Sequence, residues 1–320
     1  MRYSAAPMEG VTSFHYRGIH ARYFPGVDRY YTPFLSPTQH HVFPPKEWKE
    51  IAPEHNEGVP VIPQLLTRRA EDFIWAANEL ARLGYPEVNL NLGCPSGTVV
   101  AKGKGSGFLG DPEGLDIFLD RIFSSVTVPI SVKTRLGLRE PEEFSRLLDI
   151  YNRYPIAELT IHPRVQTDFY KHPARPEAFA AAFSQSRIPV CYNGDLVTAA
   201  NCAALTKRFP ALDSIMLGRG LIANPALVGQ CKGGPGPDKD RLRAFHDDLY
   251  HTLAEDFGSR RNAMLRMKEI WFYHIHLFED NAKYAKRLRK VTDPREYETL
   301  VAQLFQDLPL QSDAWDGWND

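Results

Sequence analysis

The chain has 320 residues, of which 43% are hydrophobic, 24% charged and 12% aromatic, and its formal net charge is −1. This length suits about two domains of roughly 150 residues, or one large barrel with an appendage. The apolar fraction excludes a disordered or collagen-like chain. The near-zero charge excludes binding of nucleic acid through a global positive field, so any such binding must come from a local patch.

The four cysteines are too far apart for a C-x-x-C pair: Cys94, Cys191, Cys202 and Cys231. Neither a zinc knuckle nor a disulfide framework is therefore predicted. The N-terminus lacks the apolar run of a signal peptide, and no apolar stretch is long enough for a membrane span. We expect a cytoplasmic, monomeric protein that binds neither a membrane nor a metal.

Short β-branched runs alternate with amphipathic helical stretches, as in a parallel sheet with crossover helices. The eight predicted strands are Tyr3–Ala6, Arg29–Pro33, Val59–Leu65, Glu87–Leu92, Pro129–Thr134, Glu158–His162, Pro189–Asn193 and Ser214–Leu217. A helix is predicted over Ala70–Leu83, where apolar residues recur at i, i+3 and i+4. Eight such units predict a (β/α)8 TIM barrel, which usually spans about 250 residues.

A Gly-Gly-Pro-Gly-Pro run at Gly233–Pro237 indicates a linker, and the pattern after it is helical. We therefore predict an α/β protein with three parts. Residues 1–232 form a TIM-barrel catalytic domain, and residues 238–308 form a small all-helical C-terminal domain. Residues 309–320 form an acidic tail that contains Trp315 and Trp318.

Polar residues follow most of the predicted strands, and barrels of this kind have their active sites at these strand ends. The residues are Pro7, Met8, Glu9, Gln64, Asn89, Asn91, Cys94, Lys133, Arg135, His162, Arg164, Asn193, Gly194, Asp195, Gly218 and Arg219. The loops after strands seven and eight commonly form a phosphate site. Either loop alone could be a glycine turn, but together Asn193-Gly194-Asp195 and Gly218-Arg219-Gly220 predict a phosphorylated cofactor such as FMN.

Lys133 ends the fifth strand, where its ammonium group could stabilise negative charge on a reduced flavin. It could instead be the Schiff-base lysine of an aldolase, or a lysine that only reaches solvent. His162 could hydrogen-bond a cofactor phosphate or simply cap its strand.

Cys94 lies in the loop Asn91-Leu92-Gly93-Cys94-Pro95-Ser96-Gly97 at the predicted barrel mouth. A free thiol has a pKa near 8.5 and is mostly protonated at neutral pH, so it can act as a general acid. A nucleophilic role would require a base and a lowered pKa. The third alternative is a small buried hydrophobe, which is our interpretation of the other three cysteines.

The segment Ser259–Arg295 holds ten basic and four acidic residues, interleaved with aromatic ones. Such a mixture can grip a phosphate backbone, or it can form a solvated helix face. The predicted RNA-binding residues are Lys102, Lys104, Arg260, Arg261, Lys283, Lys286, Arg287, Arg289 and Lys290.

From Ala6 to about Leu308 the sequence resembles the tRNA-dihydrouridine synthases. The resemblance rests on Ala6–Thr12 (APMEGVT), Asn91–Ser96 (NLGCPS) with the glycine loop after it, and Val132–Gly137 (VKTRLG), and on three short motifs: His162-Pro163-Arg164, Asn193-Gly194-Asp195 and Gly218-Arg219. One departure is Val165, where the family often has threonine.

The resemblance implies an FMN barrel that reduces the C5–C6 double bond of specific uridines in tRNA, with NADPH as reductant. It implies that Pro7, Met8 and Glu9 line the flavin, that Gln64 and Lys133 contact its ring, and that Cys94 protonates C5. His162, Asn193, Gly194, Asp195, Gly218 and Arg219 would hold the phosphate end. The target base must leave the RNA stack, so the enzyme also needs a grip on the RNA, which the basic helices offer.

Three other functions fit parts of the sequence. An FMN-dependent TIM-barrel reductase of a small pyrimidine or enone would share the phosphate loops and the lysine, but it would not need the basic helices. A flavin-free lyase would use Lys133 as a Schiff base. A non-catalytic RNA-binding protein on a decayed barrel would tolerate the loss of Cys94.

Overall fold

The computed structural model describes residues 1–313, so the predicted tail residues Trp315 and Trp318 lie outside the described residues. The chain divides into two compact units, each made of several segments. Unit 1 comprises Met1–Pro7, Arg29–Gly194 and Leu212–Met216, and unit 2 comprises Met8–Asp28, Asp195–Ala211 and the chain from Leu217 onwards.

One sheet of parallel strands runs in the order β3-β2-β1-β9-β8-β7-β6-β5-β4. Its strands are β1 (Arg2–Ala5), β2 (Arg29–Tyr31), β3 (Val61–Ile62), β4 (Gln64–Leu65), β5 (Val88–Leu92), β6 (Ile130–Arg135), β7 (Leu159–His162), β8 (Val190–Asn193) and β9 (Ser214–Leu217). The two end strands, β3 and β4, are consecutive and separated only by Pro63, which cannot donate a ladder hydrogen bond. They are therefore one barrel strand interrupted by a proline, and the sheet closes into the predicted (β/α)8 barrel.

The strands have apolar residues on one face and polar residues on the other, as the two-residue period of a strand allows. In β5 all five residues are buried. Asn89 and Asn91 make side-chain hydrogen bonds with residues of the neighbouring strands, and Val88, Leu90 and Leu92 alternate with them. The barrel interior is thus unusually polar.

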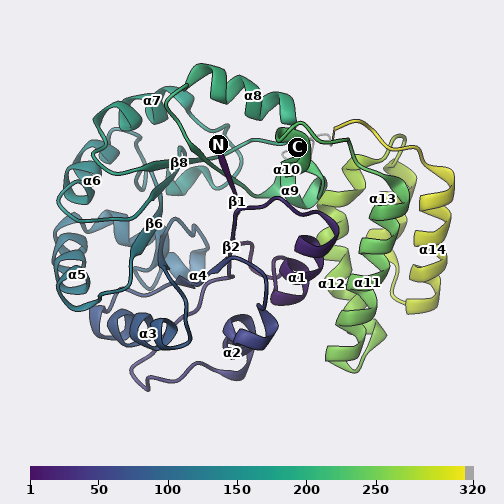
Figure 1. Cartoon of the computed structure of the whole chain (residues 1–320), viewed down its shortest axis with the longest axis horizontal. Helices are drawn as coiled ribbons and strands as arrows, with labels where there is room; N and C mark the ends of the chain where they lie inside the picture. Colours follow the sequence, from purple (N-terminus) through teal and green to yellow (C-terminus); the bar gives the residue numbers. More distant parts are fainter. Residues whose placement is uncertain (314–320) are drawn as a thin grey trace. The chain divides into compact units, whose positions relative to one another are not determined.

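Helices α3, α5, α6 and α7 of unit 1 follow one another around the outside of the sheet (Figure 1), and unit 1 also contains α2 and α4. They are α2 (Pro45–Ile51), α3 (Ala70–Arg82), α4 (Gly97–Val100), α5 (Pro112–Ser125), α6 (Glu143–Tyr151) and α7 (Pro176–Gln185). Helix α3 buries Phe73, Ala77 and Leu80, which have the spacing that predicted it. The Asp111 side chain accepts a hydrogen bond from Gly114 N and caps α5.

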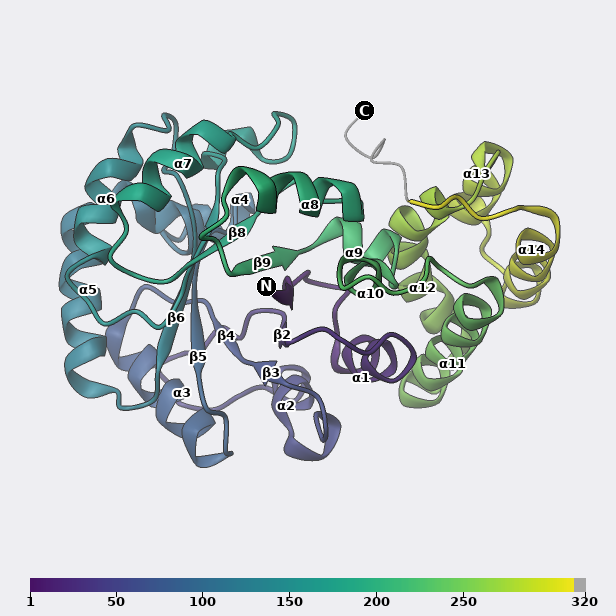
Figure 2. The same ribbon diagram turned by 45° about the horizontal axis from the view of Figure 1, so that its top comes forward.

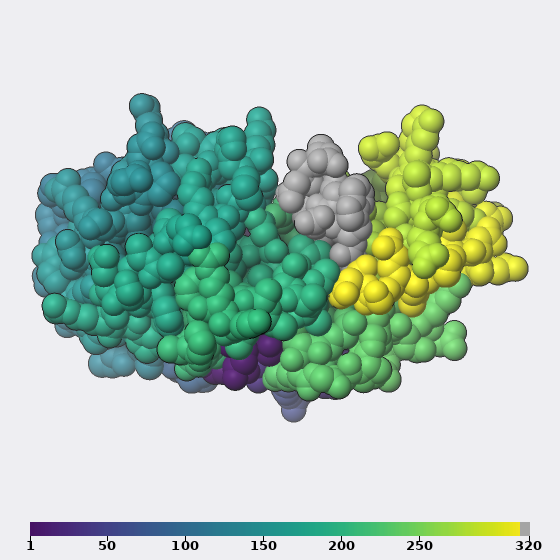
Figure 3. Space-filling model, turned by 90° about the horizontal axis from the view of Figure 1, so that it is seen from above, coloured from purple at the N-terminus to yellow at the C-terminus, as the bar shows by residue number. Residues whose placement is uncertain are grey.

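Within the described residues, unit 2 consists mainly of helices. Its helices are α1 (Phe14–Tyr23), α8 (Ala199–Arg208), α9 (Arg219–Ala223), α10 (Leu227–Cys231), α11 (Lys239–Phe257), α12 (Arg260–His274), α13 (Ala282–Lys290) and α14 (Pro294–Asp307). The last four lie side by side in Figure 2, and α13 and α14 form neighbouring surface in Figure 3. The side chains of Asp238, Ser259 and Asp293 accept hydrogen bonds from backbone N–H groups in the first turns of α11, α12 and α14. These N-cap residues therefore define where the three helices begin.

A buried polar network ties the C-terminal helices together. The Tyr297 hydroxyl of α14 lies 2.7 Å from His246 Nε2 of α11, and it accepts a hydrogen bond of 2.9 Å from Trp271 Nε1 of α12. Leucine, methionine and phenylalanine side chains surround the three rings. Packing against this core determines which faces of the helices are exposed, including the face of α13 that carries its lysine and arginine residues.

The structure confirms the predicted TIM barrel followed by a helical C-terminal region, and each predicted strand is present within two residues of its expected bounds. The predicted helix over Ala70–Leu83 is α3. Within residues 1–313, none of the helices is long and apolar enough to cross a membrane.

Candidate active site

A ladder of amide side chains crosses the interior of the barrel. Gln64 donates from Nε2 to Asn89 Oδ1 at 2.7 Å and accepts from Asn91 Nδ2 at 2.7 Å, and Asn89 donates to Ser131 Oγ at 2.9 Å. Gln64 and Asn89 are fully buried, so these hydrogen bonds replace the ones that their amide groups would make with water. The ladder fixes Asn91, whose carbonyl oxygen is then available to the loop that follows.

That loop carries Cys94. Asn91 Oδ1 accepts hydrogen bonds from Gly93 N at 3.0 Å and Cys94 N at 2.9 Å, and the Cys94 carbonyl accepts from Ser106 N and Oγ at 3.1 and 2.8 Å. A Cβ at Gly105 would lie 2.8 Å from this carbonyl, and Gly105 has a φ of +56°. The glycine loop therefore packs against the cysteine loop and holds Cys94, a partly exposed residue, in a defined place.

Lys133 extends from β6 and remains partly exposed. Burial and, to a smaller extent, the nearby Arg135 guanidinium lower the pKa of Lys133, the Cys191 and Cys94 thiols act in the opposite direction, and the resulting pKa is about 8. Lys133 is paired with Asn91 in the register of β5 and β6. Lys133 therefore lies near Cys94, and its ammonium group has a lowered pKa.

His162, at the end of β7, accepts a hydrogen bond of 2.8 Å at Nε2 from Arg164 Nη1. Because arginine can only donate, His162 Nε2 is the acceptor of this hydrogen bond. Arg164 is itself anchored by the His172 carbonyl. The guanidinium groups of Arg164 and Arg135 lie 5.9 and 5.4 Å from the exposed Tyr170 ring, an aromatic that the sequence did not single out.

The predicted phosphate loops fall partly in each unit. In unit 1, Asn193 is buried and donates from Nδ2 to the Met216 carbonyl at 2.9 Å, so it joins β8 to β9. In unit 2, Arg219 Nη2 donates to Asp195 Oδ1 at 2.9 Å. A Cβ at Gly220 would lie 2.3 Å from the Leu196 carbonyl, so only glycine allows the start of α9 to approach the loop after Asp195.

The turn after Pro7 is closed on itself. The Met8 carbonyl accepts from Val11 N and Thr12 N at 3.0 Å, and Met8 N donates to Thr12 Oγ1 at 2.8 Å. Arg266 of α12 donates from Nη1 to the Gly10 carbonyl. Met8 is partly exposed and Glu9 is exposed at this turn.

Comparison with known sequences places the chain in a family. Residues 4–308 match the profile of the family described as "Dihydrouridine synthase (Dus)". The chain belongs to the dihydrouridine synthase family. A probable tRNA-dihydrouridine synthase 1 of Synechocystis is 32% identical over 230 residues, which are 70% of this chain and 62% of that protein. A tRNA-dihydrouridine(16) synthase of Pseudomonas putida is 30% identical over 83% of each chain, and tRNA-dihydrouridine synthase B of Pasteurella multocida is 25% identical over 94% of this chain and 91% of its own length.

Solved structures agree with the barrel. A variant of NCR from Zymomonas mobilis has a TM-score of 0.53 at 15% identity, over 73% of this chain and 87% of its own. Morphinone reductase has a TM-score of 0.52 at 15% identity, over 75% of this chain and 88% of its own. At this identity the likeness shows the fold alone. With the family match, the predicted family and the prediction of an oxidoreductase enzyme are confirmed.

In this family member the predicted RNA-binding residues of α13 are all exposed, and they surround the buried Tyr284 and Leu288: Lys283, Lys286, Arg287, Arg289 and Lys290. Arg261 is exposed on α12, and Lys102 is exposed in unit 1, where Lys104 is half-buried. Burial and the charge of Lys102 lower the pKa of Lys104. Arg260 differs, because its Nε and Nη2 atoms both donate hydrogen bonds to the Glu298 carboxylate of α14.

The aromatic residues interleaved with these charges mostly serve packing. Trp271 and Tyr284 are buried, whereas Phe272 is 57% exposed. Sequence reasoning also missed Arg266 and its bond to Gly10, because the two residues are 256 positions apart and no local pattern joins them.

Proposed function

We propose that this family member is an FMN-dependent tRNA-dihydrouridine synthase that reduces the C5–C6 double bond of specific uridines in tRNA, with NADPH as reductant. The observation that carries the proposal is the family match over residues 4–308, with Cys94 and Lys133 in common surroundings. The relatives quoted above bear tRNA-dihydrouridine synthase names, and those names motivate the choice of substrate.

The donor set suits a cofactor with a polar ring and an anionic tail. Lys133 offers a cation, and Gln64 offers amide groups on the same face of the sheet. For the phosphate we propose Arg219, Asp195 and Gly218 of unit 2, together with His162, Asn193 and Gly194 of unit 1. Asp195 accepts a hydrogen bond from the Arg219 guanidinium and orients it, and a guanidinium is a group suited to an anionic acceptor. Pro7, Met8 and Glu9 would line the flavin from the first loop.

When bound, FMN would supply hydride chemistry for C6 of the uracil ring, with NADPH as the proposed reductant. The protein residues supply the proton and the environment. Cys94 would give its proton to C5 from a loop that Asn91 and Ser106 hold in place. Lys133 would place a positive charge near the reacting groups, where negative charge must be stabilised. The exposed basic residues of α12 and α13, with Lys102 and Lys104, would bind the RNA backbone.

The direct test is the dihydrouridine content of an unmodified tRNA transcript after incubation with the protein and NADPH, measured by mass spectrometry of nucleosides. We expect Cys94→Ala to keep FMN and tRNA binding and to lose at least about 100-fold in rate, the usual contribution of a general acid. Cys231→Ala is the matched control, because Cys231 is the other partly exposed cysteine. Full turnover by Cys94→Ala would remove the thiol from the mechanism.

A further inference from the structure

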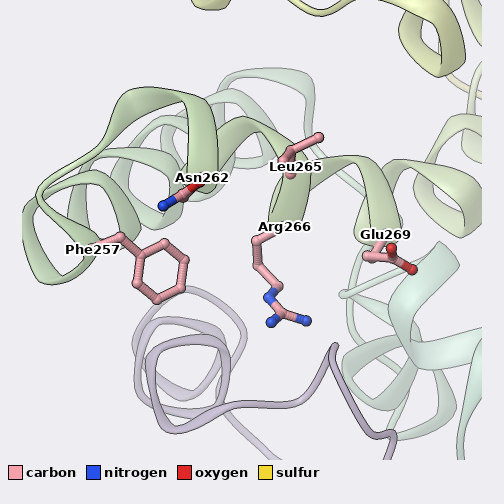
Figure 4. A pocket seen from close by; sticks show the side chains of 5 residues that line it. All are labelled: Phe257, Asn262, Leu265, Arg266 and Glu269. Carbon is pink, nitrogen blue, oxygen red and sulfur yellow. The ribbon is translucent and has the colours of Figure 1, made fainter.

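A pocket of about 330 Å³ opens on the surface of unit 2 and has no role in the function proposed above. It is lined by one face of α12 and the last residue of α11: Phe257, Asn262, Leu265, Arg266 and Glu269 (Figure 4). This volume is at the lower end of the range of about 300–1,000 Å³ for small-ligand sites, so the pocket suits a single planar group.

The lining has the groups with which proteins hold an unpaired nucleobase. Phe257 is 37% exposed and Leu265 is 47% exposed, and together they offer an aromatic and an aliphatic surface. Bases of single-stranded RNA stack on such aromatic side chains. The Asn262 amide can donate and accept, and the Glu269 carboxylate can accept from an exocyclic amino group. Among the described residues, no hydrogen bond occupies the Glu269 carboxylate.

Arg266 joins the pocket to the Met8–Gly10 turn. Its side chain leaves α12 toward the N-terminal segment (Figure 4), and its Nη1 donates to the Gly10 carbonyl. The φ of Gly10 is +80°, so the backbone conformation that presents this carbonyl favours glycine. Because the turn is bonded from Met8 to Thr12, a displacement of the Gly10 carbonyl moves the turn as one piece.

The local charge favours RNA as the occupant. The pocket lies on α12, in the segment Ser259–Arg295 with its excess of basic residues, and Arg261 is exposed on the same helix. A phosphate next to a stacked base would meet the guanidinium groups of Arg261 and Arg266.

We propose that this pocket binds one unpaired nucleotide of the tRNA, distinct from the uridine that is reduced, and that Arg266 is a positioning residue that transmits its binding to the Met8–Gly10 turn. This inference rests on the proposed function, since it takes tRNA as the substrate. It adds a second contact with a base, which would select the orientation of the tRNA.

The test is a scan of tRNA transcripts that each lack one base. With wild-type protein we expect one abasic position other than the target uridine to weaken binding about tenfold, the effect of losing one stacked base. Phe257→Ala should bind intact tRNA about tenfold more weakly and should no longer respond to that abasic position. Phe257→Trp keeps a stacking surface and should behave as wild type. If every abasic position weakens the wild type and Phe257→Ala by the same factor, the pocket does not hold a base.

Arg266 is tested by separating kcat from KM. Phe257→Ala should raise the KM for tRNA and leave kcat unchanged, whereas Arg266→Ala should also lower kcat at saturating tRNA, because the turn has lost its anchor. Arg241→Ala removes an exposed arginine from α11 and is the matched control. In hydrogen exchange, tRNA should protect the Met8–Thr12 amides of the wild type but not those of Arg266→Ala. Equal protection in both proteins would refute the coupling.

Failure of this inference is distinguishable from failure of the proposed function. A wild-type protein that neither binds tRNA nor forms dihydrouridine contradicts the function. A protein that does both, but shows no coupling between Phe257 and any base, contradicts only the proposal that the pocket binds a nucleotide.

Discussion

At the scale of single residues, the chemistry of the site depends on side chains whose surroundings differ sharply. Cys94 is held by backbone hydrogen bonds and is a partly exposed residue. Lys133 lies in surroundings that disfavour its charged form, next to Arg135. Asp195 and Arg219 form an ion pair. The surroundings of Lys133 and of Arg219 each lead to a separate prediction.

Lys133 should make the reduction of the flavin depend on pH. Its pKa is lowered to about 8, so the ammonium is charged below that pH and neutral above it. The unfolded chain holds this proton up to about pH 10.4, so the contribution of Lys133 to stability rises with pH between these values. The rate of flavin reduction by NADPH should fall as pH rises through about 8, and Lys133→Arg, which stays charged, should remove this decline. Identical pH profiles for the two proteins in stopped-flow measurements would contradict the assignment.

Arg219→Ala should weaken retention of FMN. A hydrogen bond to a charged group contributes about 1.5–3 kcal/mol, so the dissociation constant should rise roughly 10- to 100-fold. Fluorescence of FMN released on dilution measures this. Arg208→Ala, which removes an arginine next to Phe209 in the same unit, should leave the constant unchanged.

At the scale of elements, strands and helices could be predicted well because each is specified by a local pattern. The apolar period of α3 and the alternation of β5 are visible in the sequence. The interruption of a barrel strand at Pro63 follows from proline chemistry, although the pattern over Val59–Leu65 is continuous. Contacts over long separations could not be predicted: the sequence contains no sign that Arg260 binds Glu298 or that Arg266 meets Gly10.

Helix α13 should contribute to RNA affinity through its charge. Replacing Lys286, Arg287 and Arg289 by glutamate should raise the dissociation constant for tRNA and flatten its dependence on salt, because fewer counterions are released on binding. Exchanging lysine and arginine at the three positions keeps the charge and should keep the slope. A slope unchanged by the glutamates, measured by filter binding over a salt series, would place the RNA elsewhere.

At the scale of the whole molecule, stability has contributions from two separate cores, the barrel and the helical core around Tyr297. Tyr297→Phe leaves the buried Trp271 N–H and the His246 ring without their shared partner. An unsatisfied buried donor costs about 1–3 kcal/mol, so the free energy of unfolding of the helical core should fall by about that amount. Tyr273→Phe, a partly exposed tyrosine on α12, is the control. Urea unfolding followed by tryptophan fluorescence reports the difference, and equal midpoints would mean that the network contributes nothing.

The proposed function requires the whole molecule to join two half-reactions, oxidation of NADPH and reduction of uridine in RNA. The most direct measurement is the visible absorption of the purified protein without air, first on addition of NADPH and then on addition of an unmodified tRNA transcript. The account predicts flavin bands that bleach with NADPH and return with tRNA, with one dihydrouridine formed for each flavin reoxidised. A protein without flavin bands that cannot be reconstituted with FMN, or a reduced flavin that tRNA does not reoxidise, would contradict it.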